Sequence, residues 1–183
     1  IQAMVDRSKV FIGYVNEQVA KKNMPSEIAL LPFVESGYNP LANSTVGAAG
    51  LWQMMPATAT GDYRLNINWW YDERRDVLIS TTASLKYLTS LDRSFNNWLV
   101  AAAAYNVGQG YVTKAIAANK RAGKPTDFWN LSLPKETRSY VPKLLAMAMI
   151  IKNAQQYGIQ LPDVSNTPYF SSIKLNTQMD LGE

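Results

Sequence analysis

Apolar residues recur at helical spacing along most of this 183-residue chain, and no stretch alternates apolar and polar residues over four or more positions. A period near 3.6 places apolar side chains on one face of an α-helix, whereas a half-buried strand needs a period of two. Proline and glycine interrupt the pattern where helices are expected to stop. The sequence therefore predicts an all-α globular domain of about seven helices.

The positions of the expected helices follow from the apolar spacing and from residues that start or stop helices. The predicted helical segments span residues 5–22, 28–34, 76–92, 97–105, 111–121 and 142–157, with a short helix beginning at Pro56. Asp76 is expected to cap the helix that follows it, because a side-chain oxygen there accepts backbone N–H groups of the first turn. Pro32 should kink or tighten the helix just before Glu35. Residues 41–50 and 61–71 are predicted to be loops.

One domain fits the length of the chain, and we expect it to cover residues 1–160. After Leu161 the composition shifts to Pro, Ser, Asn and Thr, so residues 161–183 are predicted to be an extension or the start of a linker. No apolar run is long enough to span a bilayer, and no transmembrane segment is expected. No signal peptide is visible, and because the chain opens at Ile1 and not at Met, we expect it to be a fragment of a longer precursor.

The chain contains neither cysteine nor histidine. This excludes disulfides, Cys/His metal sites, cysteine nucleophiles and Ser-His catalysis, so acid/base chemistry must fall to Asp, Glu or Tyr. The net charge of +4 could suit an acidic polymer, but the basic residues are dispersed, with no run longer than Lys21-Lys22. An ordinarily solvated surface is the favoured interpretation, and no nucleic-acid partner is expected.

Glu35 differs from the other carboxylates because it directly follows an apolar run, Leu30–Val34. Burial beside that run would raise the pKa of the carboxyl group, which is what a general acid near neutral pH requires. A solvent-exposed glutamate at a helix end is the simpler interpretation, and position alone favours it. The charged run Asp72–Asp76, by contrast, is predicted to be an exposed surface segment.

Four short motifs occur in a fixed order along the chain. They are Glu35–Pro40 followed by Ser44, then Gly50–Pro56, then Ala104–Asn106, then Glu136–Val141. This order resembles the lytic transglycosylases whose catalytic domain is similar to goose-type lysozyme. The resemblance covers roughly Met4–Leu161 and implies a lysozyme-like helical domain with loops that line a saccharide groove.

The resemblance implies that Glu35 is the lone catalytic acid/base. The positions it assigns to substrate binding are Ser44, Gln53, Met55, Tyr105, Asn106, Glu136 and Tyr140, with Trp52 where many relatives carry Met. Sugar rings stack on aromatic side chains, and their hydroxyl and acetamido groups need hydrogen bonds, so these residue types suit a glycan. For Trp69, Trp70 and Trp98, packing in the core is the favoured interpretation.

The implied activity is cleavage of the β-1,4 bond between N-acetylmuramic acid and N-acetylglucosamine in peptidoglycan, with formation of 1,6-anhydro ends. Neither a metal nor a cofactor is expected. The family further implies a monomer that acts on glycan strands in the periplasm, anchored to the outer membrane in the full-length precursor. The alternatives are a hydrolytic muramidase of the lysozyme type, a non-catalytic glycan-binding module and a basic helical nucleic-acid binder.

Overall fold

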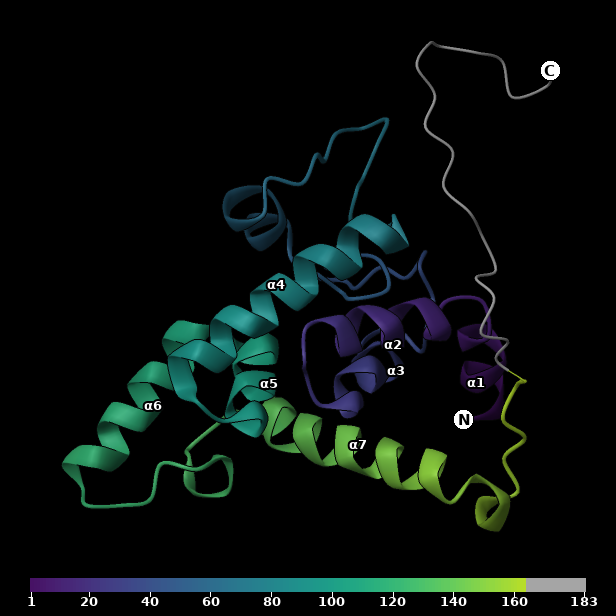
Figure 1. Ribbon diagram of the computed structural model, residues 1–183. Helices are drawn as coiled ribbons and strands as arrows, with labels where there is room; N and C mark the ends of the chain where they lie inside the picture. The colour runs from purple at the N-terminus through teal and green to yellow at the C-terminus, as the bar shows by residue number, and fades with distance from the viewer. Residues whose placement is uncertain (164–183) are drawn as a thin grey trace, which may run out of the picture.

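Helices make up the framework of residues 1–163, the part of the chain that the computed structural model describes (Figure 1). The α-helices are α1 (Gln2–Ser8), α2 (Ile12–Lys21), α3 (Leu31–Glu35), α4 (Val77–Phe95), α5 (Trp98–Val107), α6 (Gln109–Arg121) and α7 (Lys135–Lys152). Shorter turns are the 3-10 segments η1 (Ser26–Leu30), η3 (Phe128–Asn130) and η4 (Ala154–Tyr157) and the π-helical turn η2 (Thr58–Asp62). Extended pairing within the described residues is limited to isolated bridges, so the all-α prediction is confirmed.

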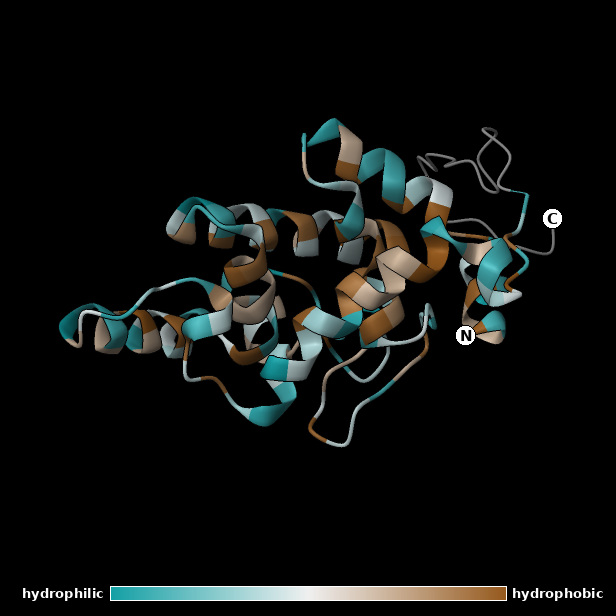
Figure 2. Cartoon of the chain, turned by 90° about the horizontal axis from the view of Figure 1, so that it is seen from below, coloured by the Kyte–Doolittle hydropathy of each residue, from teal (hydrophilic) through white to brown (hydrophobic). Residues whose placement is uncertain are grey.

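The alanine-rich helix α5 lies at the centre of the fold. Residues 100–104 are all buried, and α5 packs against α4, α6 and α7. Alanine side chains allow neighbouring helices to approach closely, and the surrounding helices turn their larger apolar residues inward. Figure 2 shows the resulting distribution, with hydrophobic segments towards the middle of the molecule and hydrophilic ones at its periphery.

Two side-chain caps fix where the central helices begin. Asp76 accepts hydrogen bonds from the backbone N–H groups of Leu78 and Ile79, both at 2.9 Å, which confirms the predicted cap. Asn97 caps α5 in the same way. These caps satisfy N–H groups that have no partner within the first turn, so they set the start of each helix.

Two predicted helices differ from those observed. The segment 5–22 is divided into α1 and α2 by a turn at residues 9–11, which follows the buried Ser8 hydroxyl that bonds the Val5 carbonyl. The last long helix begins at Lys135 and not at Pro142. Pro142 removes one backbone donor inside α7, but the packing of this helix against α3 and α5 outweighs that loss.

Glu35 ends a short helical segment that changes its geometry as Pro32 predicts. The 3-10 turn η1 gives way to α3, with Pro32 in its first turn. At this position the missing N–H of proline costs no helical hydrogen bond. The chain then reverses through Gly37, whose φ of +61° lies in the left-handed region that favours glycine. Tyr38 anchors the turn, because its buried hydroxyl donates to the Ala29 carbonyl at 2.9 Å. Glu35 is thereby fixed at the edge of the core.

The two ends of the described segment meet. The Gln2 side chain donates to the carbonyl of Gln160 and accepts from its N–H, at 2.9 Å in both cases. Most of the predicted extension 161–183 lies outside the described residues. Across residues 1–163, no helix combines the length and the apolar character that crossing a bilayer would require.

Candidate active site

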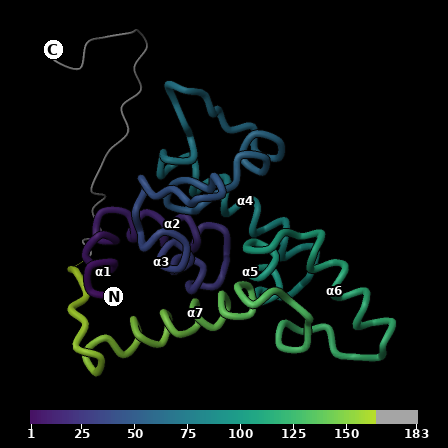
Figure 3. The backbone as a smooth tube through the Cα atoms, turned by 180° about the vertical axis from the view of Figure 1, so that it is seen from behind, coloured from purple at the N-terminus to yellow at the C-terminus, as the bar shows by residue number. Residues whose placement is uncertain are grey.

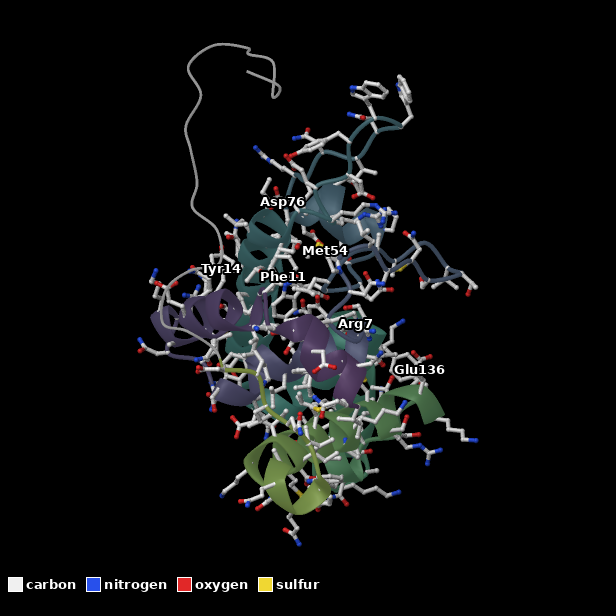
Figure 4. The ribbon with its side chains drawn as sticks, turned by 90° about the vertical axis from the view of Figure 1, so that its right-hand side faces the viewer. Arg7, Phe11, Tyr14, Met54, Asp76 and Glu136 are labelled. Atoms are coloured by element: carbon white, nitrogen blue, oxygen red, sulfur yellow. The ribbon has the colours of Figure 1, made fainter. Side chains whose placement is uncertain are left out.

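A pocket of about 470 Å³ opens between α3, the loop 41–55, the C-terminal end of α5 and the start of α7. Figure 4 shows two of its residues on different elements, Met54 on the loop and Glu136 near the start of α7. Of the predicted site residues, those that line the pocket are Glu35, Ser44, Gln53, Met55, Tyr105, Asn106, Glu136 and Tyr140. The fold thus brings together all four motifs.

The Glu35 carboxylate is the chemical centre of this pocket. Burial is the main cause that raises the pKa of Glu35 to about 7, and the nearby charge of Glu136 acts in the same direction. The Tyr140 hydroxyl opposes this effect, because it donates to Glu35 Oε1 at 2.5 Å and stabilises the anion. Near neutral pH the carboxyl group therefore exists in both protonation states, and it can donate a proton and take one back.

Tyr105 and Asn106 at the end of α5 tie the pocket walls to the core. The Tyr105 hydroxyl lies 2.9 Å from the Trp52 carbonyl and 3.2 Å from Ser84 Oγ, and burial raises its pKa well above the ordinary value. Asn106 Oδ1 accepts a hydrogen bond of 2.8 Å from the Thr137 hydroxyl on α7. These contacts hold the end of α5 against its neighbours, so the groove is formed before substrate arrives.

Ser44 and Gln53 belong to the loop that forms the opposite wall, and both brace its backbone. Ser44 Oγ accepts from the Ala48 N–H at 2.9 Å. The Gln53 amide nitrogen donates to the carbonyls of Gly50 at 2.8 Å and Ala42 at 3.2 Å. Both residues also line the pocket.

Arg74 fixes this loop from behind, which corrects the prediction that residues 72–76 are an exposed charged run. Only 7% of Arg74 is exposed. Its guanidinium donates to the carbonyls of Gly47 at 2.7 Å and Met54 at 3.1 Å, and it pairs with Asp72 at 2.8 Å. The Arg74 backbone also lies close to the loop, so that a Cβ added to Gly50 would lie 1.8 Å from the Arg74 carbonyl oxygen.

Arg75 holds the first part of the same loop. Its guanidinium donates to the Leu41 carbonyl at 3.2 Å and to Asn43 Oδ1 at 2.6 Å. The adjacent Asp76 caps α4, so the loop is joined to the longest helix through one short segment. This arrangement was not predictable from local sequence, because the arginines and the oxygen atoms that they bind lie 20 to 34 positions apart.

The prediction that Trp52 binds substrate is wrong in this structure. The side chain is fully buried, and its indole N–H donates to Thr81 Oγ1 at 2.9 Å. The large apolar ring gains more from packing in the core than it would from the pocket wall. Trp52 reaches the site only through its carbonyl, which lies within hydrogen-bond distance of the Tyr105 hydroxyl.

The three remaining tryptophans considered in the sequence divide into two groups. Trp98 packs against the core as expected. Trp69 and Trp70 do not, because 89% and 81% of their surfaces are exposed. Among the described residues, no group of three or more His, Cys, Asp or Glu side chains is placed to hold a metal ion.

Known proteins are similar to this chain in both sequence and fold. The family model described as the transglycosylase SLT domain matches residues 14–128. The chain belongs to the transglycosylase SLT domain family. It is 44% identical, over 97% of its length, to membrane-bound lytic murein transglycosylase D of Escherichia coli strain K12, and it covers 39% of that protein. It is 36% identical, over 88% of its length, to a putative tributyltin chloride resistance protein of Alteromonas sp. strain M-1, and covers 76% of it.

A solved structure supports the lysozyme-like fold that the family resemblance implied. An inactive mutant of lytic transglycosylase Slt from Pseudomonas aeruginosa superposes with a TM-score of 0.54 at 24% identity. The match covers 80% of this chain and 24% of that one. The family resemblance found in the motifs is confirmed. The chain spans about two fifths of the Escherichia coli relative.

Proposed function

We propose that this SLT domain is a peptidoglycan lytic transglycosylase in which Glu35 is the single catalytic acid/base. The observation that carries the proposal is the Glu35 carboxyl group, which lines the pocket with a pKa of about 7 and is hydrogen-bonded to Tyr140. Two relatives of Escherichia coli that are named as murein transglycosylases, the membrane-bound transglycosylase D and the soluble lytic murein transglycosylase, support murein as the substrate.

In the first step, protonated Glu35 donates its proton to the glycosidic oxygen that leaves C1 of N-acetylmuramic acid. The C1–O bond breaks, and the oxygen of the sugar's own 2-acetamido group bonds to C1 to give an oxazolinium-like intermediate. This intramolecular group replaces the second carboxylate that most glycosidases use. The hydrogen bond from Tyr140 stabilises the Glu35 anion as it forms.

In the second step, anionic Glu35 takes the proton from the 6-hydroxyl group of the same muramoyl residue. The 6-oxygen attacks C1 and displaces the acetamido oxygen, which closes a 1,6-anhydro ring. Glu35 returns to its protonated form, and no water is consumed. One group thus acts first as acid and then as base, which requires a pKa near the working pH.

The other pocket residues are proposed to hold the glycan. Ser44, Gln53 and Asn106 supply polar groups for hydroxyl and acetamido groups, and Met55 supplies an apolar surface for a sugar face. Ser44 lies on the groove wall whose loop Arg74 anchors through the Gly47 carbonyl. Glu136 acts on the reaction through the pKa of Glu35.

Hydrolysis, as in a lysozyme, is the alternative in which water replaces the 6-hydroxyl group. The name transglycosylase, which the family model and the Escherichia coli relative carry, supports intramolecular transfer over hydrolysis. We further propose that the precursor works as a periplasmic monomer anchored to the outer membrane, for which the words "membrane-bound" in the relative's name are the support.

A substitution at Glu35 tests this proposal. The Glu35→Gln variant should lose turnover of purified murein sacculi while it still folds and binds glycan. Ser44→Ala should slow the reaction less severely. Release of soluble muropeptides, followed by chromatography, measures both effects. Near-normal lysis by Glu35→Gln would overturn the assignment, and an unchanged rate for Ser44→Ala would remove Ser44 from the site.

A further inference from the structure

Trp69, Trp70 and Tyr71 form an exposed aromatic tip at the end of a long loop. The loop, residues 63–76, stands out from the helices in both Figure 1 and Figure 3. The two indole rings lie side by side with their centroids 4.6 Å apart, and Tyr71 is half exposed. A contiguous apolar group of this kind on a surface loop is typical of a binding site.

Hydrogen bonds hold the aromatic tip in a fixed shape. Asn68 Oδ1 accepts from the N–H groups of Trp70 at 2.9 Å and Tyr71 at 2.8 Å, and the Asn68 N–H donates to the Tyr71 carbonyl at 2.8 Å. Below this turn, both carboxylate oxygens of Glu73 accept from Asn66, at 2.7 and 3.0 Å. The rings are therefore presented to solvent by an ordered turn, which lowers the entropic cost of binding.

The loop that carries the tip is continuous with the wall of the pocket. On one side it follows η2, where Thr58 still lines the pocket. On the other side it leads to Asp72, which pairs with the same Arg74 that holds the Gly47 and Met54 carbonyls of the pocket loop. The aromatic tip and the groove wall are thus parts of one braced unit.

The local charge identifies the kind of partner. Residues 63–76 contain three acidic and three basic side chains, so the loop lacks the net positive charge that would attract an acidic lipid surface. Exposed indole faces suit the C–H faces of sugar rings, and the indole N–H groups can donate to hydroxyls. A murein strand is a long polymer, so it extends beyond a pocket of about 470 Å³.

We propose that Trp69 and Trp70 form a secondary glycan-binding platform that contacts murein outside the catalytic pocket. This inference rests on the proposed function, since it takes the same polysaccharide as its ligand. The platform holds the polymer near the groove, so it affects binding and turnover of intact sacculi more than turnover of a short glycan that fills only the pocket.

Binding is tested in the Glu35→Gln background, where cleavage does not confuse the measurement. Co-sedimentation with purified sacculi should show that Trp69→Ala/Trp70→Ala weakens binding about tenfold, while Trp69→Phe/Trp70→Phe retains most of it. Trp129→Ala is the matched control, because Trp129 is also exposed (62%) but belongs to η3, which follows α6 and lies outside the loop. The control should bind like the parent, and thermal unfolding checks that each variant is folded.

Two further measurements separate the possible outcomes. With active Glu35, the alanine double variant should lose more rate on sacculi than on a short murein glycan, whose cleavage tests the proposed function by itself. Equal binding of sacculi by parent and double variant would overturn the platform. So would tryptophan-dependent binding to phosphatidylethanolamine/phosphatidylglycerol vesicles without tryptophan-dependent binding to sacculi, because the tip would then be a membrane contact.

Discussion

The Tyr140 hydroxyl donates a 2.5 Å hydrogen bond to Glu35 Oε1, and this contact joins two residues that lie 105 positions apart. It connects the end of α3 to the first turns of α7 inside the pocket. The hydrogen bond lowers the pKa of Glu35, whereas burial and the charge of Glu136 raise it. The pKa of about 7 is the balance of these effects. A substitution of each neighbour should therefore shift the pKa of Glu35 in a direction that can be stated in advance.

Tyr140→Phe should shift the alkaline limb of the pH–rate profile to higher pH. The substitution removes the donor that stabilises the Glu35 anion, so the pKa of Glu35 rises. The profile of kcat/KM on murein measures the pKa in the free enzyme. A limb that moved to lower pH, or stayed in place, would contradict the assigned role of the hydrogen bond.

Glu136→Gln should shift the same limb in the opposite direction. Removal of a nearby negative charge makes the Glu35 anion easier to form, so the pKa of Glu35 falls. Glu17→Gln serves as the control, because Glu17 is exposed and pairs with Lys21 on α2. Its profile should match that of the wild type, and a shift of equal size in both variants would indicate a general charge effect.

Glu35→Gln should stabilise the domain at alkaline pH. The pKa of Glu35 is raised on folding from 4.5 to about 7, so the folded state binds the proton more tightly than the unfolded state. The wild type consequently loses stability as the pH rises between these values, by at most about 3 kcal/mol, and the Gln variant does not. Thermal unfolding at pH 5 and pH 8 compares the two, and a variant no more stable than wild type at pH 8 contradicts the burial of the charge.

Arg74→Ala should weaken both the fold and the binding of substrate. It leaves Asp72 without its buried partner and frees the Gly47 and Met54 carbonyls, at a cost of about 3 kcal/mol. KM should rise, because the wall carrying Ser44 and Gln53 loses its anchor.

Two control variants separate the contribution of the guanidinium geometry from that of the positive charge. Arg74→Lys keeps the charge but lacks the planar group that binds Asp72 and two carbonyls together, so it should restore stability only in part. Arg93→Ala removes an exposed arginine on α4 and should change neither the free energy of unfolding nor KM. Full recovery of KM in Arg74→Lys would show that charge alone is needed.

The helices could be predicted because they depend on local sequence, and the role of Glu35 could be predicted because its motifs resemble those of a known family. Helical spacing and the Asp76 cap need only neighbouring residues, and the motif order placed Glu35 in the pocket with Tyr105 and Tyr140. Position alone favoured a solvent-exposed Glu35, and the structure instead gives the partly buried setting that its apolar neighbours left open.

The features that could not be predicted depend on contacts between distant residues. Trp52 sits within a site motif, yet which way its ring points is decided by Thr81 and the core. Arg74 has the sequence context of a surface charge, and only the fold brings the Gly47 carbonyl to it. The exposure of Trp69 and Trp70 is likewise a property of the turn that Asn68 builds.

The source of the oxygen at the new muramoyl end tests the central claim most directly. Sacculi digested by the wild-type domain in oxygen-18-labelled water are analysed by mass spectrometry. The proposed mechanism predicts unlabelled 1,6-anhydro ends, lighter by one water molecule than reducing ends, and no such product from Glu35→Gln. Labelled reducing ends as the main product would contradict transglycosylation and identify the enzyme as a hydrolase.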